Sequence, residues 1–181
     1  MSDNFDTRAA LITGASDGLG RALARGLSEQ GWHIIITARG AERLNHLRDE
    51  LGATAIPGDV SDPVHRQTLA DAIGRHGRLD LVVNNASELG PSPMPRLATY
   101  PLDELARVYE TNVIAPLAIL QFTLPFLKAS TGLAVNISSD AAVAPYEGWG
   151  GYGSSKAALD HLTAIFAVEN PDVPIYSFDP G

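Results

Sequence analysis

The sequence predicts a doubly wound parallel α/β fold, in which helices cover both faces of a central sheet in three α/β/α layers. Three observations support this fold class. Short apolar runs alternate with segments of helical periodicity through all 181 residues, the order expected of parallel strands joined by crossover helices. The runs are continuously apolar, as in strands buried on both faces. A glycine-rich turn joins the first run directly to the helix that follows it.

Six strands and five helices can be placed from this pattern. The predicted strands are Ala9–Thr13, His33–Ala38, Thr54–Pro57, 79–86, 132–139 and 173–178. The predicted helices are 21–27, Ala41–Leu51, 63–75, 102–127 and 152–169. Pro116 lies inside the fourth helix and should kink it. No repeat or linker interrupts this order, so we expect a single domain over residues 1–181.

The composition is that of a soluble globular protein, with 45% hydrophobic and 19% charged residues. A formal net charge of −8 and the lack of a basic run argue against a general nucleic-acid binder. The absence of cysteine excludes disulfides and a cysteine nucleophile, and no metal site is predicted. The N-terminus resembles no signal peptide, and prolines break the apolar stretch 113–127, which is too short to span a bilayer. We therefore expect a cytoplasmic protein without a membrane segment.

The turn after the first strand has the spacing Gly-x-x-x-Gly-x-Gly, at Gly14, Gly18 and Gly20. Glycines there let the backbone turn tightly and approach a pyrophosphate at the positive end of the next helix. Such a turn alone is a weak signal, but its place between a strand and a helix strengthens it. We therefore predict a dinucleotide site whose phosphate cradle consists of Gly14, Ser16, Asp17, Gly18, Leu19 and Gly20.

Arg39 follows the second strand, where a dinucleotide fold meets the adenosine ribose. An acidic residue there would bind the ribose 2′-hydroxyl, whereas an arginine suits a 2′-phosphate. No acid occupies Thr37, Ala38 or Gly40, so Arg39 favours NADP(H), with NAD(H) as the second choice; the alternative is an arginine in a solvated loop. Asp59 and Val60 lie past the third strand, where the aspartate either lines an adenine pocket or bonds its own turn.

Small or polar residues end the remaining strands. Asn84-Asn85-Ala86 ends the fourth strand, Ser139 ends the fifth, and Pro180-Gly181 follows the sixth. The asparagine amides could bond neighbouring strands and keep the edge open for a ligand. Parallel strands end at one edge of their sheet, so these residues should share that edge with the glycine turn and Arg39.

Tyr152 and Lys156 stand four residues apart in the last predicted helix, so their side chains share one face. A phenol has a reference pKa of about 10, and a nearby ammonium favours the phenolate and lowers that pKa. The pair is therefore a candidate proton-transfer device, although by itself such a pair is more often an ordinary surface contact.

Together these motifs resemble those of the short-chain dehydrogenase/reductase family. The turn beginning at Thr13 has the family's glycine form, Asn84-Asn85-Ala86 matches its Asn-Asn-Ala motif, and Asp179-Pro180-Gly181 is similar to its Pro-Gly after the sixth strand. Four further residues follow the order and spacing of its catalytic tetrad: Asn112, Ser139, Tyr152 and Lys156. The resemblance covers nearly the whole chain and implies a Rossmann-type domain that binds NAD(P)(H).

The resemblance also implies roles. Tyr152 would be the general acid/base of a hydride transfer between nicotinamide and a carbonyl/alcohol substrate, and Ser139 would hold the substrate oxygen. Lys156 would lower the tyrosine's pKa and bond the nicotinamide ribose, while Asn112 would support a water that links the lysine to solvent. Ser138 is the rival serine, but the family's spacing selects Ser139. The implied cofactor-binding residues are Gly14, Ser16, Asp17, Gly18, Leu19, Gly20, Arg39, Asp59, Val60, Asn85, Ala86, Tyr152, Lys156, Pro180 and Gly181.

The chain departs from the family pattern at Ser87, where glycine is usual, at Asp140, and beyond Pro-Gly. Family members usually continue there with a substrate-covering loop, helices and a seventh strand, so we expect a domain that ends after the sixth strand and lacks that C-terminal part. The sequence predicts an NADP-preferring oxidoreductase of small carbonyl or alcohol compounds, and the resemblance suggests a homodimer or homotetramer paired through helices 102–127 and 152–169. The alternative is a nucleotide-binding sensor or scaffold without turnover. A sugar-nucleotide epimerase or dehydratase on a related fold is a third interpretation, but the usual glycine spacing and larger substrate domain of those enzymes are not found here.

Overall fold

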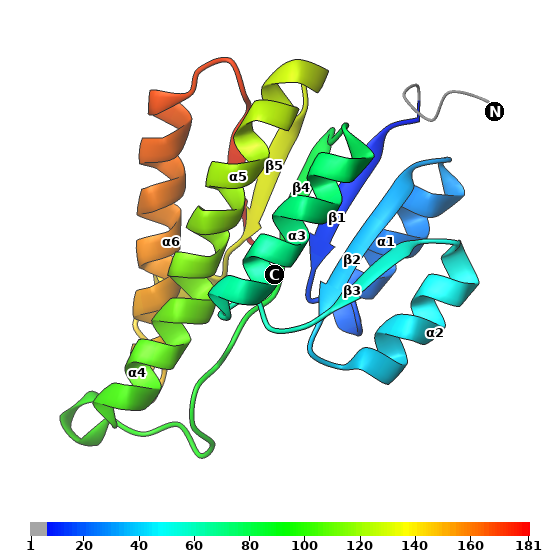
Figure 1. The fold of residues 1–181 in the computed structure, drawn as a ribbon. Helices are drawn as coiled ribbons and strands as arrows, with labels where there is room; N and C mark the ends of the chain where they lie inside the picture. The colour runs from blue at the N-terminus through cyan, green and yellow to red at the C-terminus, as the bar shows by residue number, and fades with distance from the viewer. Residues whose placement is uncertain (1–6) are drawn as a thin grey trace.

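A computed structural model describes residues 7–181. Its centre is one sheet of six parallel strands in the order β3-β2-β1-β4-β5-β6 (Figure 1). The strands are β1 Ala9–Thr13, β2 His33–Ala38, β3 Thr54–Pro57, β4 Leu81–Asn84, β5 Leu133–Ile137 and β6 Ile175–Phe178. The predicted doubly wound parallel sheet is confirmed.

The strand order reverses between β1 and β4: β2 and β3 lie on one side of this pair, and β5 and β6 lie on the other. In open α/β sheets, ligands bind outside the carboxyl ends of the strands at the point of reversal. The register brings these ends level, since Thr13 pairs with Thr37 and Asn84 pairs with Asn136. The turn after β1 and the residues after β4 therefore meet at one edge.

Helices cover both faces of the sheet, as Figure 1 shows. The helices are α1 Gly18–Glu29, α2 Ala41–Leu51, α3 Pro63–His76, α4 Leu102–Tyr109, α5 Ala115–Ser130 and α6 Gly150–Glu169. On one face, Ile12 and Ile36 of the strands pack in one core with Ala24 of α1 and Leu44 of α2. On the other face, a second core joins the sheet to α3 and α5. Because each central strand buries both of its faces, the continuous apolar runs are explained.

The ends of α3 show how local sequence sets an element. Asp62 caps the helix by accepting a hydrogen bond from the Val64 backbone N–H at 2.8 Å, and Pro63 occupies the first turn. Gly77 ends the helix in the left-handed region, with φ 81°.

The predicted helix 102–127 is divided into α4, a π-helical turn η2 Glu110–Ile114, and α5. The irregular turn comes just before Pro116, and it carries the fully buried Asn112. The expectation drawn from residues 113–127 stays a prediction, although Leu102–Ser130 as a whole is long and apolar enough to cross a membrane. Its residues Ile119 and Leu127 nevertheless lie in the hydrophobic core, as in a core helix.

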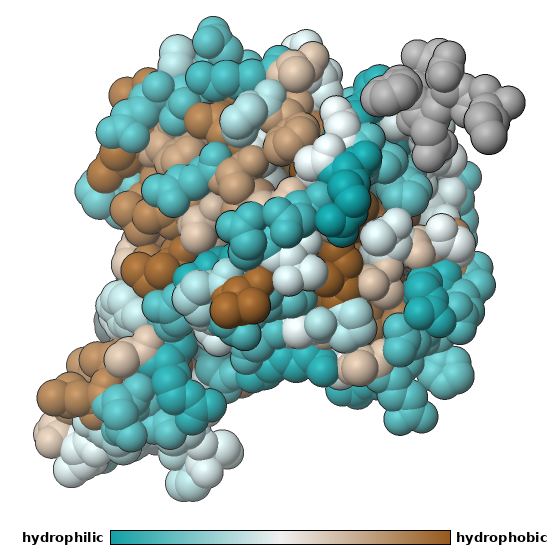
Figure 2. All heavy atoms as spheres, in the orientation of Figure 1, coloured by the Kyte–Doolittle hydropathy of each residue, from teal (hydrophilic) through white to brown (hydrophobic). Residues whose placement is uncertain are grey.

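Two surfaces remain apolar. On the face drawn in Figure 2, hydrophobic residues gather over the side formed by α5 and α6, and α6 exposes Ile165 and Val168. The α1 side of the sheet also holds a groove of about 460 Å³, between α1 and strands β4, β5 and β6. Tyr176 and Phe178 of β6 line this groove and are more than half exposed.

Candidate active site

Two glycines of the turn after β1 leave no room for a side chain. Gly14 has φ 66°, and a Cβ placed there would lie 2.8 Å from Asn85 Nδ2. A Cβ at Gly20 would lie 2.6 Å from the same nitrogen and 2.6 Å from the Gly14 carbonyl oxygen. The turn, the start of α1 and the end of β4 are therefore in direct contact, and no side chain covers the backbone at Gly14 and Gly20.

Asn85 ties the ends of β1 and β4 together. Its Nδ2 donates hydrogen bonds to the carbonyl oxygens of Thr13 at 3.0 Å and of Gly14 at 3.2 Å. The backbone N–H groups of Asn85 and Ala86 both donate to Thr13 Oγ1 at 2.9 Å. These bonds explain why β4 ends at Asn84 rather than at residue 86, and they hold the edge of the sheet in shape for a ligand.

A cavity of about 190 Å³ opens beside this turn, and residues following β1, β2, β3 and β4 line it. Six predicted cofactor-binding residues are among the lining residues: Gly14, Ser16, Arg39, Asp59, Val60 and Ala86. The close-packed glycine turn at a helix N-terminus and the arginine at the far side of the cavity fit the pyrophosphate and adenosine parts of a nicotinamide dinucleotide.

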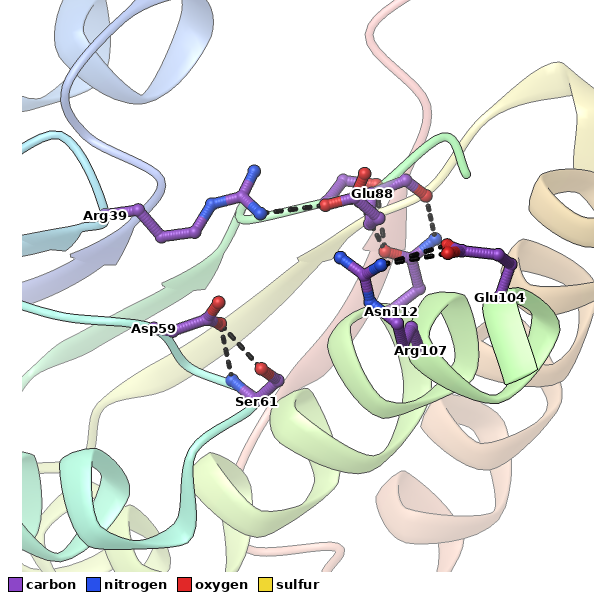
Figure 3. A network of polar contacts seen from close by, with 8 residues as sticks. Arg39, Asp59, Ser61, Glu88, Glu104, Arg107 and Asn112 are labelled. Atoms are coloured by element: carbon purple, nitrogen blue, oxygen red, sulfur yellow. Dashed lines mark hydrogen bonds and ion pairs between the residues drawn. The ribbon is translucent and has the colours of Figure 1, made fainter. Parts of the chain in front are cut away.

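Each of two arginines at the cavity has a carboxylate partner. Arg39 Nη1 lies 2.9 Å from Glu88 Oε2, as Figure 3 shows. Arg43 Nη1 lies 3.1 Å from Asp17 Oδ2. Sequence reasoning missed Arg43, although it stands four residues after Arg39 at the start of α2. Glu88 had no recognisable sequence signal, because its contact with Arg39 joins the ends of two strands that are not neighbours.

Asp59 combines both interpretations of its role. Its side chain forms hydrogen bonds within its own turn, and it also lines the cavity. Its Oδ1 accepts hydrogen bonds from the Ser61 backbone N–H at 2.9 Å and from the Ser61 hydroxyl at 2.8 Å. Burial raises the pKa of Asp59, but these hydrogen bonds outweigh it and hold the pKa below its usual value. The carboxylate is thus ionised at the cavity wall.

Tyr152 and Lys156 lie in the first turns of α6, one turn apart. Lys156 Nζ lies 5.5 Å from the centroid of the Tyr152 ring and donates a hydrogen bond to the Ile137 carbonyl oxygen at 2.6 Å. Lys156 is 2% exposed. Burial lowers the pKa of Lys156 to about 8, and Asp160 opposes that shift. The pair is not a solvated surface contact, since the ammonium is buried against the end of β5.

Glycines let the start of α6 pack closely on both sides of Tyr152. A Cβ at Gly151 would lie 2.3 Å from the Tyr100 hydroxyl oxygen, and one at Gly153 would lie 2.7 Å from the Ala141 carbonyl oxygen. The helix also begins two residues earlier than predicted, at Gly150. The backbone that carries Tyr152 is therefore held by its neighbours on each side.

Ser139 is the more accessible of the two serines that follow β5. Its hydroxyl donates to Asp140 Oδ1 at 3.1 Å, and its Oγ accepts from the Ala141 backbone N–H at 3.2 Å. The Tyr146 hydroxyl donates to Asp140 Oδ2 at 2.8 Å. Hydrogen bonds from Tyr146 and Ser139 hold the pKa of Asp140 below its usual value. Ser138, by contrast, is buried, and its hydroxyl has no hydrogen-bond partner among the described residues.

Asn112 connects the loop after β4 to α6. Its Oδ1 accepts from the Glu88 backbone N–H at 2.8 Å and from the Ser87 hydroxyl at 3.2 Å. Its Nδ2 donates to the Glu88 carbonyl oxygen and to Ser155 Oγ, both at 2.9 Å. The Ser155 hydroxyl donates in turn to the Tyr152 carbonyl oxygen at 2.6 Å. The Asn112 amide thus forms its hydrogen bonds with protein groups. Its support of a water beside Lys156 stays a prediction.

Trp149 adds an aromatic wall that sequence reasoning missed. Its ring makes edge contacts with Tyr152 at 5.7 Å and with Tyr146 at 6.0 Å between centroids. The three rings come from positions three residues apart. In retrospect that spacing, together with the start of a helix, is the signal that could have found them.

Several predicted cofactor residues are not among those that line the cavity. Leu19 lines the apolar groove on the α1 side of the sheet instead. Asp17 and Gly18 are exposed at the start of α1, where Asp17 caps the helix by accepting from the Gly18 N–H at 2.9 Å. Pro180 and Gly181 are exposed after β6. Any role of these residues in cofactor binding stays a prediction.

The fold and this site define a class of protein: a dinucleotide-binding α/β domain with a tyrosine–lysine pair beside the point of strand reversal. The chain belongs to the short-chain dehydrogenase/reductase family, since the family model described as "short chain dehydrogenase" matches residues 8–181. It is therefore an oxidoreductase of a family that uses a nicotinamide cofactor.

Known proteins agree with this assignment. The chain is 32% identical over 180 residues to an uncharacterized oxidoreductase of Staphylococcus epidermidis, and the match covers 96% of this chain and 77% of that protein. It is 33% identical over 198 residues to sepiapterin reductase of Mus musculus, covering 99% of this chain and 76% of that protein. A metagenomic short-chain oxidoreductase solved in complex with NADP superposes with a TM-score of 0.87 at 31% identity, covering 96% of this chain and 82% of that one.

Proposed function

We propose that this protein transfers a hydride between NADP(H) and a small carbonyl or alcohol compound, with Tyr152 as the general acid/base. One observation carries the proposal: the buried ammonium of Lys156 lies one helical turn from Tyr152, at the edge that also holds the glycine turn. The pair thus places a lysine beside the phenol that would exchange the proton with the substrate oxygen.

Each residue around the pair has a separate role in the proposed reaction. In reduction, Tyr152 gives its phenolic proton to the carbonyl oxygen, and in oxidation it takes a proton from the alcohol. Ser139 donates to the same oxygen, which requires its hydroxyl to leave Asp140 Oδ1 at 3.1 Å. The nicotinamide, when bound, supplies or accepts the hydride. Asn112 is a positioning residue, because it acts on Tyr152 only through Ser155 and the helix backbone.

The preference for NADP(H) rests on charge at the adenosine end of the cavity. Arg39 and Arg43 both line the cavity near Ser16, and a guanidinium pairs well with a phosphate group. The acidic residue that would select the 2′-hydroxyl of NAD(H) is not found at the end of β2. The relative solved with NADP supports the same choice by likeness.

The direct test is turnover of NADPH with a panel of ketones and aldehydes by the wild type and Tyr152→Phe. We expect the substitution to lower turnover by about 10²- to 10⁴-fold, the usual contribution of general acid/base catalysis. NADPH binding, followed by fluorescence, should persist. Tyr176→Phe is the matched control, since this exposed tyrosine lies on β6 in the apolar groove. Turnover that survives in Tyr152→Phe would exclude the proposed mechanism.

We also propose that the protein is a homodimer or homotetramer. Ile165 and Val168 of α6 are exposed to solvent, as is Ile114 just before α5. Apolar residues on the outer side of two long helices favour helix pairing between copies. Light scattering should give a mass of two or four chains, and the mass of a single chain at micromolar concentration would contradict the proposal.

A further inference from the structure

The ion pair between Arg39 and Glu88 spans the candidate cofactor site. Arg39 follows β2 and Glu88 follows β4, and β1 with its glycine turn lies between these two strands. Figure 3 shows the Arg39 side chain extended toward Glu88 across the carboxyl ends of the strands. A dinucleotide whose pyrophosphate lies on the glycine turn would have to pass this pair.

Glu88 is the fixed partner of the two. Both its backbone N–H and its carbonyl oxygen are bonded to the amide of Asn112, at 2.8 and 2.9 Å. Its side chain is 25% exposed, whereas that of Arg39 is 62% exposed. The carboxylate is therefore held at the edge of the cavity, and Arg39 is the group that can swing away from it.

The carboxylates around the cavity disfavour the binding of an anionic ligand. The two arginines face three carboxylates, those of Asp17, Asp59 and Glu88. Asp17 and Arg43 are both more than 60% exposed, so water weakens that pair. The pair formed by Glu88 is less exposed on its acidic side, so a phosphate competes most directly with Glu88 for a guanidinium.

We propose that Glu88 sets the cofactor selectivity of this protein by competing with the ribose 2′-phosphate for Arg39. Binding of a 2′-phosphorylated cofactor exchanges the Arg39–Glu88 ion pair for an Arg39–phosphate pair. A cofactor without that phosphate leaves the Arg39–Glu88 ion pair intact. The carboxylate therefore weakens the preference for NADP(H) that Arg39 alone would confer. This inference rests on the proposed NADP(H) preference.

The test uses two ligands that carry no nicotinamide, adenosine 2′,5′-bisphosphate and AMP, with dissociation constants measured by calorimetry. We expect Glu88→Gln to tighten binding of the bisphosphate by about 3- to 10-fold, the effect of a partly exposed ion pair. Binding of AMP should change by less than about 2-fold. The fold should be unaffected, since the bonds to Asn112 use the Glu88 backbone, and thermal unfolding checks this.

Two further variants separate competition for Arg39 from a general change of charge. Glu104→Gln removes one acidic charge from a pair with Arg107 on α4, away from the lining of the cavity, and should leave both dissociation constants unchanged. In the Arg39→Ala background, Glu88→Gln should lose most of its effect on the bisphosphate.

Three results would overturn the proposal: weaker bisphosphate binding in Glu88→Gln, an equal gain for AMP, or the same gain without Arg39. Failure of the NADP(H) preference itself looks different. In that case the wild type would bind both ligands equally and Arg39→Ala would change neither, whatever Glu88→Gln does. The role of Tyr152 is independent of these measurements, because neither ligand reaches the chemical step.

Discussion

The two ends of the candidate site hold their charged groups in different ways. At the end formed after β1, β2 and β3, the arginines are exposed and each meets a carboxylate through a single ion pair. At the end formed by η2, β5 and α6, Lys156 and Asn112 are buried and bonded to backbone groups. Exposed pairs are weak and exchangeable, whereas buried polar groups are costly to leave without a partner.

This difference suggests that one end selects the cofactor while the other holds a rigid chemical centre. Substitutions at the buried end should change turnover or folding by large factors. Substitutions at the exposed end should change which ligand binds and leave the fold intact.

Replacing Lys156 by Met should have the largest effect. Methionine fills a similar volume without the ammonium, so we expect turnover to fall by about 10²- to 10⁴-fold. The free energy of unfolding should change by no more than about 1 kcal/mol, because one hydrogen bond is lost and one buried charge is removed. Steady-state kinetics and urea unfolding measure the two quantities. A loss of stability as large as the loss of activity would make Lys156 structural.

The same variant isolates a pH effect. Lys156 has a pKa of about 8 in the folded protein and an ordinary value of 10.5 when unfolded. Between these values the unfolded chain binds more protons, so stability rises with pH, and it is lowest below about pH 8, where the buried ammonium is charged. The stability of the wild type relative to Lys156→Met should rise by about 1 kcal/mol from about pH 7 to pH 9. A flat difference would show that the ammonium is not buried as described.

Replacing Asn112 by Ala should mainly cost stability. The substitution leaves the partners at Glu88 and Ser155 without their bonds, and we expect the free energy of unfolding to fall by about 2 to 4 kcal/mol. Asn45→Ala is the control, because that amide accepts only an exposed bond from Arg48 and should change stability by less than about 0.5 kcal/mol. Equal effects of the two substitutions in urea unfolding would contradict the contrast between the buried and exposed ends.

Replacing Arg39 by Ala should have the smallest effect on the fold. The free energy of unfolding should stay within about 0.5 kcal/mol of the wild type, because the ion pair is exposed. The ratio of kcat/KM for NADPH to that for NADH should fall by about 10-fold, corresponding to roughly 1.4 kcal/mol. An unchanged ratio would remove Arg39 from cofactor selection.

The sequence predicted the sheet well because its signals are local. Continuous apolar runs marked all six strands. The predicted ends of β4 and β5 lie too far along the chain. At the end of β4, the residues beyond Asn84 leave the sheet and bond Thr13. The π-helical turn around Asn112 was foreseen only as a kink near Pro116, because no propensity distinguishes it from an ordinary break.

The residues of the candidate site likewise differ in whether local sequence could predict them. The motif residues Gly14, Tyr152 and Lys156 could be found because backbone geometry or helical spacing demands those residue types at those positions. Glu88 could not, because its contact with Arg39 depends on how two separate loops meet after folding. Spacing along the chain carries no information about such contacts.

Local sequence patterns were enough to predict the parallel α/β order, the glycine turn, and the position of a tyrosine and a lysine on one helical face. These follow from short-range sterics and periodicity, which act within a few residues. Three features could be seen only in the folded chain: Lys156 is buried with a pKa of about 8, Asn112 bonds the loop after β4 to α6, and Arg39 is paired with Glu88. Burial and pairing depend on which elements pack against one another, and the long-range contacts that define them form only in the folded chain.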